Sequence, residues 1–309
     1  MPELPEVETI VRELRKKILG LKITDFWSDR DKPVKQARGV AKFKKEIKGK
    51  RIVSINRRAK FIVIDIEGDS SIFIHQKISG HLMYGKWRKV MQNAKIKMQN
   101  DNLKFKNDQT WVSTISGPLR DDSENQYIRY IWTLSNGHQV AMSDVRRFSR
   151  VILVKDKDVS SLKEIRDLGP EPLDIKFKEF KELFKNKRGN LKPTLMDPFF
   201  IVGIGNIYGD EILWDSGYHP LSRVENLKEN DFGKVYKSMI KILKKAIRYK
   251  GDSMDDYRLP SGEKGGYQNM QKAYQETGKK CKKGDGGTIQ RLKVGGRSAH
   301  FCSKHQVRV

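Results

Sequence analysis

The sequence predicts an α+β chain built from several modules, and three changes in hydrophobic pattern support this fold class. A helical pattern at the start gives way to a strand-like pattern from about residue 22 to 154, and a helical pattern then returns. The tail, 269–309, contains two short predicted strands. A chain of 309 residues is long enough for two or three modules, each with a core of its own. The expected domains are 1–155, 156–268 and 269–309.

The N-terminal segment is predicted to form an amphipathic helix from Pro5 to Ile18. Its apolar residues recur at the i, i+3, i+4, i+7 spacing of one helix face: Val7, Ile10, Val11, Leu14 and Ile18. Gly20 then suits a helix end. Acidic residues near the start and basic residues near the end complement the helix dipole.

The following region is predicted to contain several short strands. The candidates are Arg51–Asn56, Lys60–Ile66, Ser71–His75, Tyr127–Leu134, His138–Met142 and Arg150–Val154. Asn136-Gly137 between two of them is a strong hairpin signal. Several short strands after one helix indicate an antiparallel sandwich or barrel. The polar stretch 88–126 interrupts this rhythm, so we interpret it as an insertion loop.

Helices are predicted again in the second half of the chain, at Phe177–Phe184, Lys192–Phe199, Asn206–Trp214 and Asp231–Tyr249. The stretch 251–268 is polar and rich in Gly, with little to bury, and is expected to be a mobile loop. Two short strands in the tail, Thr288–Val294 and Ala299–Cys302, flank Gly295-Gly296.

The charge balance indicates an anionic partner. Lys and Arg total 63 and Asp and Glu total 38, which gives a formal net charge of +25. This excess favours nucleic acid, although ribosomal and membrane-surface proteins are also basic. No apolar run approaches the roughly 20 residues that span a bilayer, and the acidic start is unlike a signal peptide. Two Cys cannot form a disulfide framework, so a reducing, cytoplasmic setting without membrane association is expected.

The N-terminus itself carries candidate chemistry. Removal of Met1 would leave the secondary amine of Pro2 free, and such an amine is a nucleophile that can form a Schiff base with a sugar aldehyde. The α-amino group titrates nearer neutrality than Lys does, and a cationic neighbourhood favours its neutral form. Glu3 follows directly and Glu6 comes about one helical turn later. A nucleophile and acid/base groups are therefore expected at the start of one helix.

Six blocks, in a consistent order and spacing, are typical of one enzyme family. They are Pro2–Thr9, Arg58–Phe61, His75 with Ser79-Gly80, Asp144–Phe148, Gly203–Glu211, and Lys293–Arg297 ahead of His300–Cys302. With these blocks the chain resembles the formamidopyrimidine-DNA glycosylases over nearly its whole length, apart from 88–126. Leu4 favours this branch over the related endonuclease VIII branch, which usually has Gly there.

The resemblance implies roles for individual residues. Pro2 would attack C1′ of the damaged nucleotide, and Glu3 would act as acid/base for the sugar ring and the Schiff base. Glu6 would support this site. Lys60 would contact phosphate and donate a proton in β-elimination, although a Lys at an edge strand can also serve solubility alone. Arg297, at the tip of the C-terminal hairpin, would bind phosphate and act in δ-elimination.

The resemblance also implies how a base is taken out of the stack and how the DNA is held. Phe148 and Arg146 would fill the void together with Ile78, which stands where the family usually has Met and is stiffer. The alternative for the first two is a core Phe and a surface Arg. The other expected DNA contacts are His75, Tyr127, Lys187 and Asn206. Tyr127 stands where the family has a His, and the alternative for Lys187 is a residue of a solvated helix face. Asn206 is expected at a helix N-cap that leaves backbone N–H groups free for a phosphate.

A zinc site in the tail is implied only in part. The family carries four Cys in two pairs, which make a closed tetrahedral site. Here Cys281 and Cys302 are in place, His305 stands at the fourth position, and Gly284 replaces the second Cys. The hairpin is one residue longer, so Asp285 is a candidate ligand. Two alternatives stay open: zinc held by these residues, with Asp285 or water as the fourth ligand, and a hairpin of the same shape without zinc.

The resemblance implies a bifunctional DNA glycosylase and abasic-site lyase that excises 8-oxoguanine and formamidopyrimidines. The implied fold has an N-terminal helix plus an antiparallel β-sandwich, a helix–two-turn–helix domain and a C-terminal β-hairpin finger. The expected partner is double-stranded DNA with oxidised bases or abasic sites, bound by a nucleoid-associated monomer without a nucleotide or redox cofactor. The alternatives are an endonuclease VIII-like enzyme for oxidised pyrimidines and a non-catalytic binder of damaged DNA.

Overall fold

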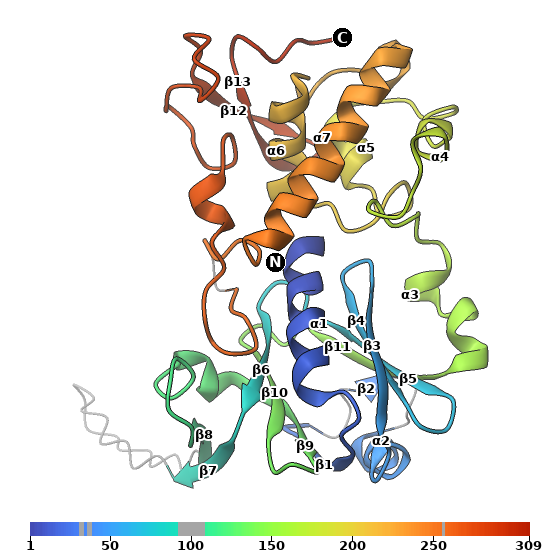
Figure 1. Ribbon diagram of the computed structural model, residues 1–309, viewed down its shortest axis with the longest axis vertical. Helices are drawn as coiled ribbons and strands as arrows, with labels where there is room; N and C mark the ends of the chain where they lie inside the picture. The colour runs from blue at the N-terminus through green and yellow to red at the C-terminus, as the bar shows by residue number, and fades with distance from the viewer. Residues whose placement is uncertain (31–33, 36–38, 92–108, 255–256) are drawn as a thin grey trace, which may run out of the picture.

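In the computed structural model the chain forms a β-rich lobe and a helical lobe, with the start of α1 between them (Figure 1). The structure describes residues 1–30, 34–35, 39–91, 109–254 and 257–309. Helix α1 (Leu4–Ile18) begins beside the helical lobe and runs along the β-lobe, where its apolar face is buried. Pro5 at the start of the helix and Glu6 in its first turn favour this start. Among the described residues, no helix has both the length and the apolar character needed to span a membrane.

The β-lobe consists of two sheets that enclose the core together with α1. The first has the order β1 (Ile23–Ser28), β9 (Ile128–Leu134), β10 (Gln139–Asp144) and β6 (Gly80–Gly85). The second has the order β2 (Val34–Lys35), β11 (Arg150–Lys155), β5 (Ser70–His75), β4 (Phe61–Ile66) and β3 (Ile52–Arg58). The strand pairs are antiparallel except for the short parallel pairing of β2 with β11. The predicted α+β class with a β-sandwich is therefore confirmed.

One helix within the strand-rich region was missed. Helix α2 (Val40–Ile47) has only two fully buried residues, Phe43 and Ile47, and they are four positions apart. A single pair of apolar residues with mostly charged residues between them does not make the repeating pattern by which a helix is predicted from sequence. The ring of Phe43 packs 4.6 Å from the ring of Phe26 and so ties the helix to β1.

The insertion 88–126 is not simply a loop. Strands β7 (Trp87–Met91) and β8 (Gln109–Ser113) pair as a hairpin, and a 3₁₀ turn, η1 (Ser123–Tyr127), follows; residues 92–108 lie outside the described residues. The aromatic residues Trp87 and Trp111 pack with Leu119 and Ile115 in a cluster on the β1–β9–β10–β6 sheet. These apolar residues are widely spaced in a polar stretch, so the sequence pattern did not predict that they pack together.

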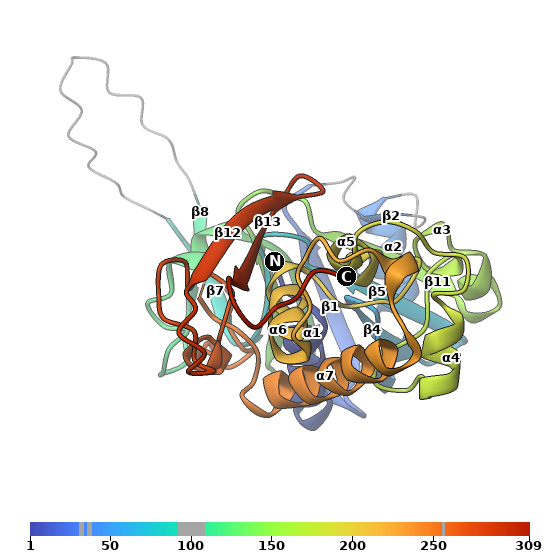
Figure 2. The ribbon, with the colours of Figure 1, turned by 90° about the horizontal axis from the view of Figure 1, so that it is seen from above.

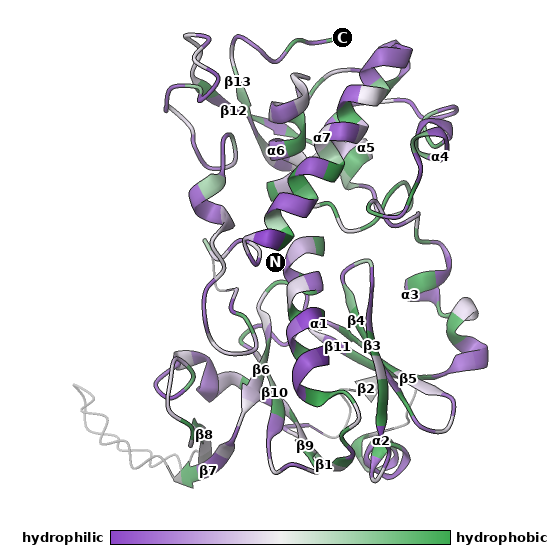
Figure 3. Ribbon diagram, viewed as in Figure 1, coloured by the Kyte–Doolittle hydropathy of each residue, from purple (hydrophilic) through white to green (hydrophobic). Residues whose placement is uncertain are grey.

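The helical lobe contains α4 (Phe177–Glu182), α5 (Leu191–Met196), α6 (Asn206–Ser216) and α7 (Glu229–Arg248), after η2 (Asp156–Ser161) and α3 (Lys163–Arg166), with η3 (Val224–Asn226) before α7. Helix α5 is shorter than predicted because Asp197 adopts an extended conformation before Pro198. Helices α6 and α7 pack together, and both α1 and α7 show hydrophilic and hydrophobic residues along their length (Figure 3).

The tail forms the predicted hairpin. Strand β12 (Ile289–Val294) pairs with β13 (Arg297–Cys302), and the two turn residues Gly295 and Gly296 both have positive φ. Strand β13 lies against α6, and Figure 2 shows α7 and the hairpin on opposite sides of that helix.

The loop 251–268 buries more than its composition suggests, so the expectation of little burial was wrong. It contains no helix or strand among its described residues except the start of the 3₁₀ turn η4 (Tyr267–Met270). Tyr257 and Leu259 are 5% and 2% exposed and belong to the core of the β-lobe. Two isolated anchors in a Gly-rich stretch make no periodic pattern, which is why the sequence did not reveal them.

Candidate active site

The start of α1 and the start of α6 meet at the carboxylate of Glu3. This side chain is 3% exposed and accepts hydrogen bonds from the backbone N–H groups of Gly205 at 2.7 Å and Ile207 at 3.0 Å. The N-terminus of a helix carries partial positive charge, so the carboxylate is stabilised there. Gly205 is required, because a Cβ at this position would clash with the Glu3 carboxylate. Pro2, which directly precedes Glu3 in the chain, is also buried.

This contact corrects the expectation for Asn206. The N-cap of α6 is Gly205 rather than Asn206, and Glu3 occupies the backbone N–H groups that were expected to be free for a phosphate. The signal in the sequence was local, whereas the ligand of these N–H groups lies about 200 residues away in the chain. The Asn206 side chain instead accepts a 2.7 Å hydrogen bond from Lys192 Nζ.

Glu6 joins three parts of the chain behind Glu3. It is 1% exposed and accepts hydrogen bonds from the backbone N–H of Glu3 at 2.8 Å, the hydroxyl of Tyr208 at 2.5 Å and the backbone N–H of Asp252 at 2.8 Å. Burial, with the charge of Glu3 as a second cause, raises the pKa of Glu6 to about 7. The start of α1, helix α6 and the root of loop 251–268 therefore share one carboxyl group that can be protonated near neutral pH.

Lys60 lies in the turn between β3 and β4 and faces the same site. Its Nζ lies 3.4 Å from the carbonyl oxygen of Ile204, in the segment that leads into α6. Burial lowers the pKa of Lys60, the nearby carboxylates of Glu3 and Glu6 oppose this effect, and Arg297 adds to it. These interactions place Lys60, both glutamates and Arg297 in one electrostatic neighbourhood.

Glu171 fixes the turn that presents Lys60, and sequence reasoning missed it. Its carboxylate pairs with Arg57, accepts a hydrogen bond from Arg58 at 3.1 Å and accepts another from the backbone N–H of Ala59 at 2.7 Å. Ala59 has a positive φ of 54°, which is a strained conformation for a residue with a side chain. An acidic residue in the segment between the lobes therefore holds a strained turn in place.

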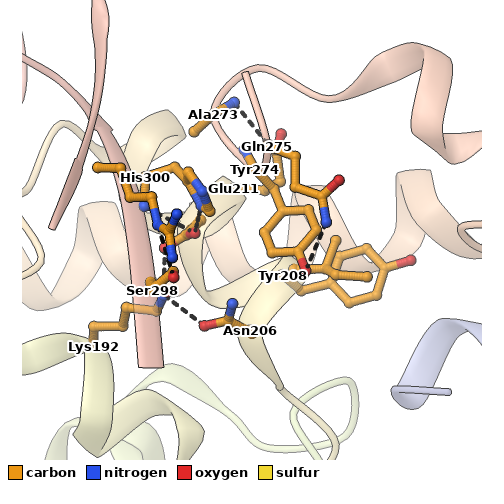
Figure 4. A network of polar contacts seen from close by, with 12 residues as sticks. Lys192, Asn206, Tyr208, Glu211, Ala273, Tyr274, Gln275, Ser298 and His300 are labelled. Atoms are coloured by element: carbon orange, nitrogen blue, oxygen red, sulfur yellow. Dashed lines mark hydrogen bonds and ion pairs between the residues drawn. The ribbon is translucent and has the colours of Figure 1, made fainter. Parts of the chain in front are cut away.

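A second missed residue, Lys192, connects α5, α6 and the tail hairpin (Figure 4). The side chain is 1% exposed, and its Nζ lies 2.6 Å from Asp210 Oδ1 and 2.7 Å from both Asn206 Oδ1 and the carbonyl oxygen of Ser298. The other oxygen of Asp210 contacts His300 Nδ1 at 2.8 Å. Burial lowers the pKa of Lys192 and the Asp210 charge raises it. The signal in the sequence was slight: a Lys before Pro193 in a short helix that is mostly apolar.

This network places the tip of the hairpin. Arg297 is exposed and precedes Ser298, whose carbonyl oxygen is bound by Lys192. Glu211, also on α6, accepts hydrogen bonds from the backbone N–H groups of residues 272–274, which lead into the tail (Figure 4). Lys187, by contrast, pairs with Asp197 at 3.1 Å and lies over the ring of Phe200, so the structure does not bring it into this network.

The predicted void-filling residues lie on two neighbouring turns that cross between the sheets. Ile78 and Phe148 are 45% and 55% exposed, and Arg146 is exposed beside Phe148, so the alternative of a core Phe148 is wrong. Asp144, which is fully buried, accepts hydrogen bonds from Ser79 Oγ at 2.6 Å and from the backbone N–H of Arg146 at 3.1 Å. One carboxylate thus holds the two turns together.

Both turns carry a residue in the left-handed region, Lys77 at φ 57° and Arg147 at φ 56°. Such conformations persist only where the surroundings enforce them, and they gather at functional sites. His75 borders the first turn: its Nδ1 accepts a 2.9 Å hydrogen bond from the backbone N–H of Lys77, and burial, with Lys77 and Lys60 as further causes, lowers its pKa to about 3. Tyr127 is partly buried beside Arg129, whose guanidinium lies over its ring.

Four donor atoms converge at the base of the hairpin. Cys281 Sγ lies 3.4 Å from His305 Nδ1, and Asp285 Oδ2 lies 3.2 Å from Cys302 Sγ and 2.9 Å from His305 Nδ1. Ligand atoms around a tetrahedral zinc lie about 3.3 to 3.8 Å apart. The four donor atoms here all lie within 4.8 Å of one another, so they can enclose the ion after small shifts. His305 Nε2 lies 2.9 Å from the Trp214 carbonyl oxygen, which favours a proton on Nε2 and leaves Nδ1 free as a ligand. Asp285, rather than Gly284, supplies the fourth donor atom of this group.

Comparisons with known proteins agree with this geometry. Residues 1–151 match the model of the formamidopyrimidine-DNA glycosylase N-terminal domain, and residues 168–258 match the model of the formamidopyrimidine-DNA glycosylase H2TH domain. The formamidopyrimidine-DNA glycosylase of Desulforamulus reducens is 32% identical, with 99% of each chain covered.

Two solved structures are of the Lactococcus lactis protein, one bound to DNA with an abasic site and one to DNA with N7-benzyl-Fapy-dG. Each is 30% identical, has a TM-score of 0.79, and is matched over 99% of this chain and 100% of the other. The matches to both domain models and the identity over the whole length lead to one conclusion. The chain belongs to the formamidopyrimidine-DNA glycosylase family.

Proposed function

We propose that the protein excises oxidised purines, 8-oxoguanine and formamidopyrimidines, from double-stranded DNA and then nicks the strand by β- and δ-elimination. The observation that carries this proposal is the buried carboxylate of Glu3, held on the start of α6 directly after Pro2 and in the electrostatic neighbourhood of Lys60. A nucleophilic amine, a positioned acid/base and a cation for phosphate are the groups that this reaction needs.

The first step forms a bond between the Pro2 nitrogen and C1′ of the damaged nucleotide, and the bond between C1′ and the base breaks. The base leaves with the electron pair of that bond and takes up a proton. Glu3 serves the sugar ring: a proton on O4′ lets the ring open, and the nitrogen lone pair forms the iminium with C1′. The backbone N–H groups of Gly205 and Ile207 hold the Glu3 carboxylate in position for this transfer.

The iminium makes the protons on C2′ acidic. Loss of one of them expels the 3′ phosphate, and a second elimination expels the 5′ phosphate. Hydrolysis of the remaining imine then returns the Pro2 amine. Lys60 and Arg297 would bind the phosphates, since both are cationic and lie close enough to Glu3 and to each other to interact electrostatically. Lys60 would also donate a proton during β-elimination.

DNA would lie along the exposed turns and the hairpin tip. Phe148, Arg146 and Ile78 would enter the duplex and occupy the space of the flipped nucleotide. The net charge of +25 supports a strong attraction to phosphates, and binding should weaken steeply with salt. Loop 251–268 would cover the flipped base, since it starts at Asp252 on the Glu6 carboxylate beside the nucleophile.

Zinc would be held by Cys281, Asp285, Cys302 and His305. When bound, it would supply structural stability rather than take part in a reaction step, since four protein donors close the site. The residues around it act on the hairpin: the Trp214 carbonyl oxygen orients His305, and the backbone N–H of Lys304 points to Cys302 Sγ at 3.4 Å. This arrangement would anchor the base of the hairpin whose tip carries Arg297.

Borohydride trapping on an 8-oxoguanine duplex tests the proposal. Correctly processed protein should form a covalent complex, and Pro2→Gly or protein that retains Met1 should not. Pro5→Ala is the matched control, because Pro5 lies in α1 rather than at the processed terminus. Tight binding without any trapping by the processed protein would instead indicate a non-catalytic binder. Excision of thymine glycol in place of 8-oxoguanine would indicate an enzyme for oxidised pyrimidines.

A further inference from the structure

The last part of the insertion, residues 114–126, touches loop 251–268. We name these 13 residues the limb. At Gly262, where φ is +87°, an added Cβ would lie 2.8 Å from Leu119 Cδ2 and 3.1 Å from Pro118 Cβ. Real Cβ contacts are hardly ever that short, so only Gly lets the loop backbone approach the limb so closely. The contact is a specific fit between two segments that are far apart in the chain.

The limb is itself firmly anchored. Leu119 is 2% exposed and packs with Met83 and Trp87 in the cluster on the first sheet. Asn125 connects its two sides, because its amide donates to the Leu119 carbonyl oxygen at 2.8 Å and accepts from Trp87 Nε1 at 2.8 Å. A buried amide that is bonded at both its oxygen and its nitrogen makes the limb a rigid support rather than a flexible loop.

The far end of the limb reaches the void-filling turns. Glu124 Oε2 accepts a 2.9 Å hydrogen bond from the hydroxyl of Ser143. Ser143 precedes Asp144, whose carboxylate holds the turn that carries Phe148. The limb thus contacts loop 251–268 through Leu119 and, through Glu124, the residue next to Asp144, which holds the void-filling turns.

The root and the outer turn of loop 251–268 are held by different parts of the molecule. Its root is bound at Glu6, through the backbone N–H of Asp252 at 2.8 Å and the hydroxyl of Tyr257 at 3.4 Å. Its outer turn is held by a 2.8 Å hydrogen bond from the backbone N–H of Tyr84 to the Pro260 carbonyl oxygen and by the limb at Gly262. A charged and polar surface cavity lies between the limb and residues 258–264.

We infer that the limb positions residues 257–264 of the loop over the damaged base and thereby determines how well the enzyme recognises that base. This inference rests on the proposed function of the loop. A rigid support reduces the number of conformations that the loop must abandon when it closes on a base. Leu119 and Glu124 act as positioning residues, since neither contacts the nucleophile. Cleavage at a preformed abasic site involves no base to read, so it should depend little on the limb.

Leu119→Ala tests the inference, with Ile115→Ala as its matched control. Ile115 belongs to the same cluster and the same limb, but packs towards Gly85 and Trp87 rather than Gly262. In single-turnover assays, Leu119→Ala should lower the excision of 8-oxoguanine by about tenfold and leave cleavage of a preformed abasic site unchanged, whereas Ile115→Ala should change neither.

Amide hydrogen exchange measures the loop independently of activity. The backbone N–H groups of Leu259 and Gly262 donate within the loop, to Glu263 and Leu259. A peptide that covers 257–264 should exchange faster in Leu119→Ala than in the wild type, and at the wild-type rate in Ile115→Ala.

Two outcomes would overturn the inference. One is an equal loss of excision and abasic-site cleavage in Leu119→Ala, which is the effect of general destabilisation. The other is unchanged excision with unchanged exchange. In both cases the wild type still excises and cleaves, so the proposed function stands; a wild type without either activity overturns the proposed function instead.

Discussion

The Glu3 carboxylate accepts a 2.7 Å hydrogen bond from the backbone N–H of Gly205, 202 residues further along the chain. The same carboxylate is the acid/base of the proposed reaction. The proposed proton-transfer group, the Glu3 carboxylate, therefore also caps the start of helix α6. The two lobes meet at this carboxylate. Catalysis and the docking of the lobes are expected to depend on one side chain.

Replacement of Glu3 by Gln should lower base excision by about 10²- to 10⁴-fold, because the amide cannot exchange protons with the sugar ring. It should also destabilise the protein by about 1 kcal/mol, since the charge that complements the start of α6 is lost. Single-turnover excision and thermal unfolding measure the two effects. Glu46→Gln on α2, whose carboxylate lies 3.8 Å from Lys42 Nζ at the surface, serves as the control. Unchanged excision in Glu3→Gln would rule out this acid/base role.

The raised pKa of Glu6 predicts a pH-dependent stability. In the unfolded chain this carboxyl group has a pKa of 4.5, and in the folded chain about 7. Between these values the folded state binds more protons, so stability contributed by Glu6 is full below 4.5 and is lost as the pH rises through 7. The loss amounts to at most about 3 kcal/mol.

Urea unfolding of the wild type and of Glu6→Gln at several pH values isolates this contribution. Gln mimics the protonated acid, so its stability relative to the wild type should increase as the pH rises from 4.5 to 7. The difference should level off above that range. A difference that does not change with pH would show that Glu6 titrates as an ordinary carboxyl group in the folded protein.

Phe148→Ala should impair base flipping without loss of stability, because the ring is 55% exposed and stands outside the buried clusters of the described residues. Unstacking a base costs a few kcal/mol, and a wedge that fills the space offsets part of that cost. Excision from a duplex should fall at least about tenfold. Fluorescence of 2-aminopurine beside the lesion reports unstacking directly. Val145→Ala, in the same exposed turn, is the control, and equal effects of the two variants would contradict the wedge role.

The four donors at the base of the hairpin predict about one zinc ion per chain. Asp285→Ala should lower zinc affinity by at least about tenfold, while Asp158→Ala, at an exposed site in η2, should not change it. Zinc content by mass spectrometry and competition with a chelator measure both. A zinc content near zero in protein prepared without chelators would establish the metal-free hairpin, held by the contact of His305 with Asp285.

The sequence allowed many of the candidate site residues to be placed near one another because their spacing is local. Pro2 and Glu3 are adjacent, Arg146 and Phe148 share one short turn, and Asp285 directly follows the Gly that replaces a Cys. Prediction failed where partners are distant in the chain. The role of Lys192 was missed because Asp210 and Ser298, which compensate its burial, lie on other elements. Tyr257 and Leu259 looked solvated because their core lies in the other lobe.

The sequence by itself determined where most of the helices and strands lie and which residue types are available for chemistry. Periodicity and turn residues act over a few positions, and that is enough to decide a helix or a hairpin. Only the tertiary structure decided which groups meet. It placed Glu3 rather than a phosphate on the N–H groups of α6, buried Lys192 between α6 and the hairpin, and set Leu119 against Gly262. Burial and charge pairing depend on distances between remote segments, and those distances exist only once the chain has folded.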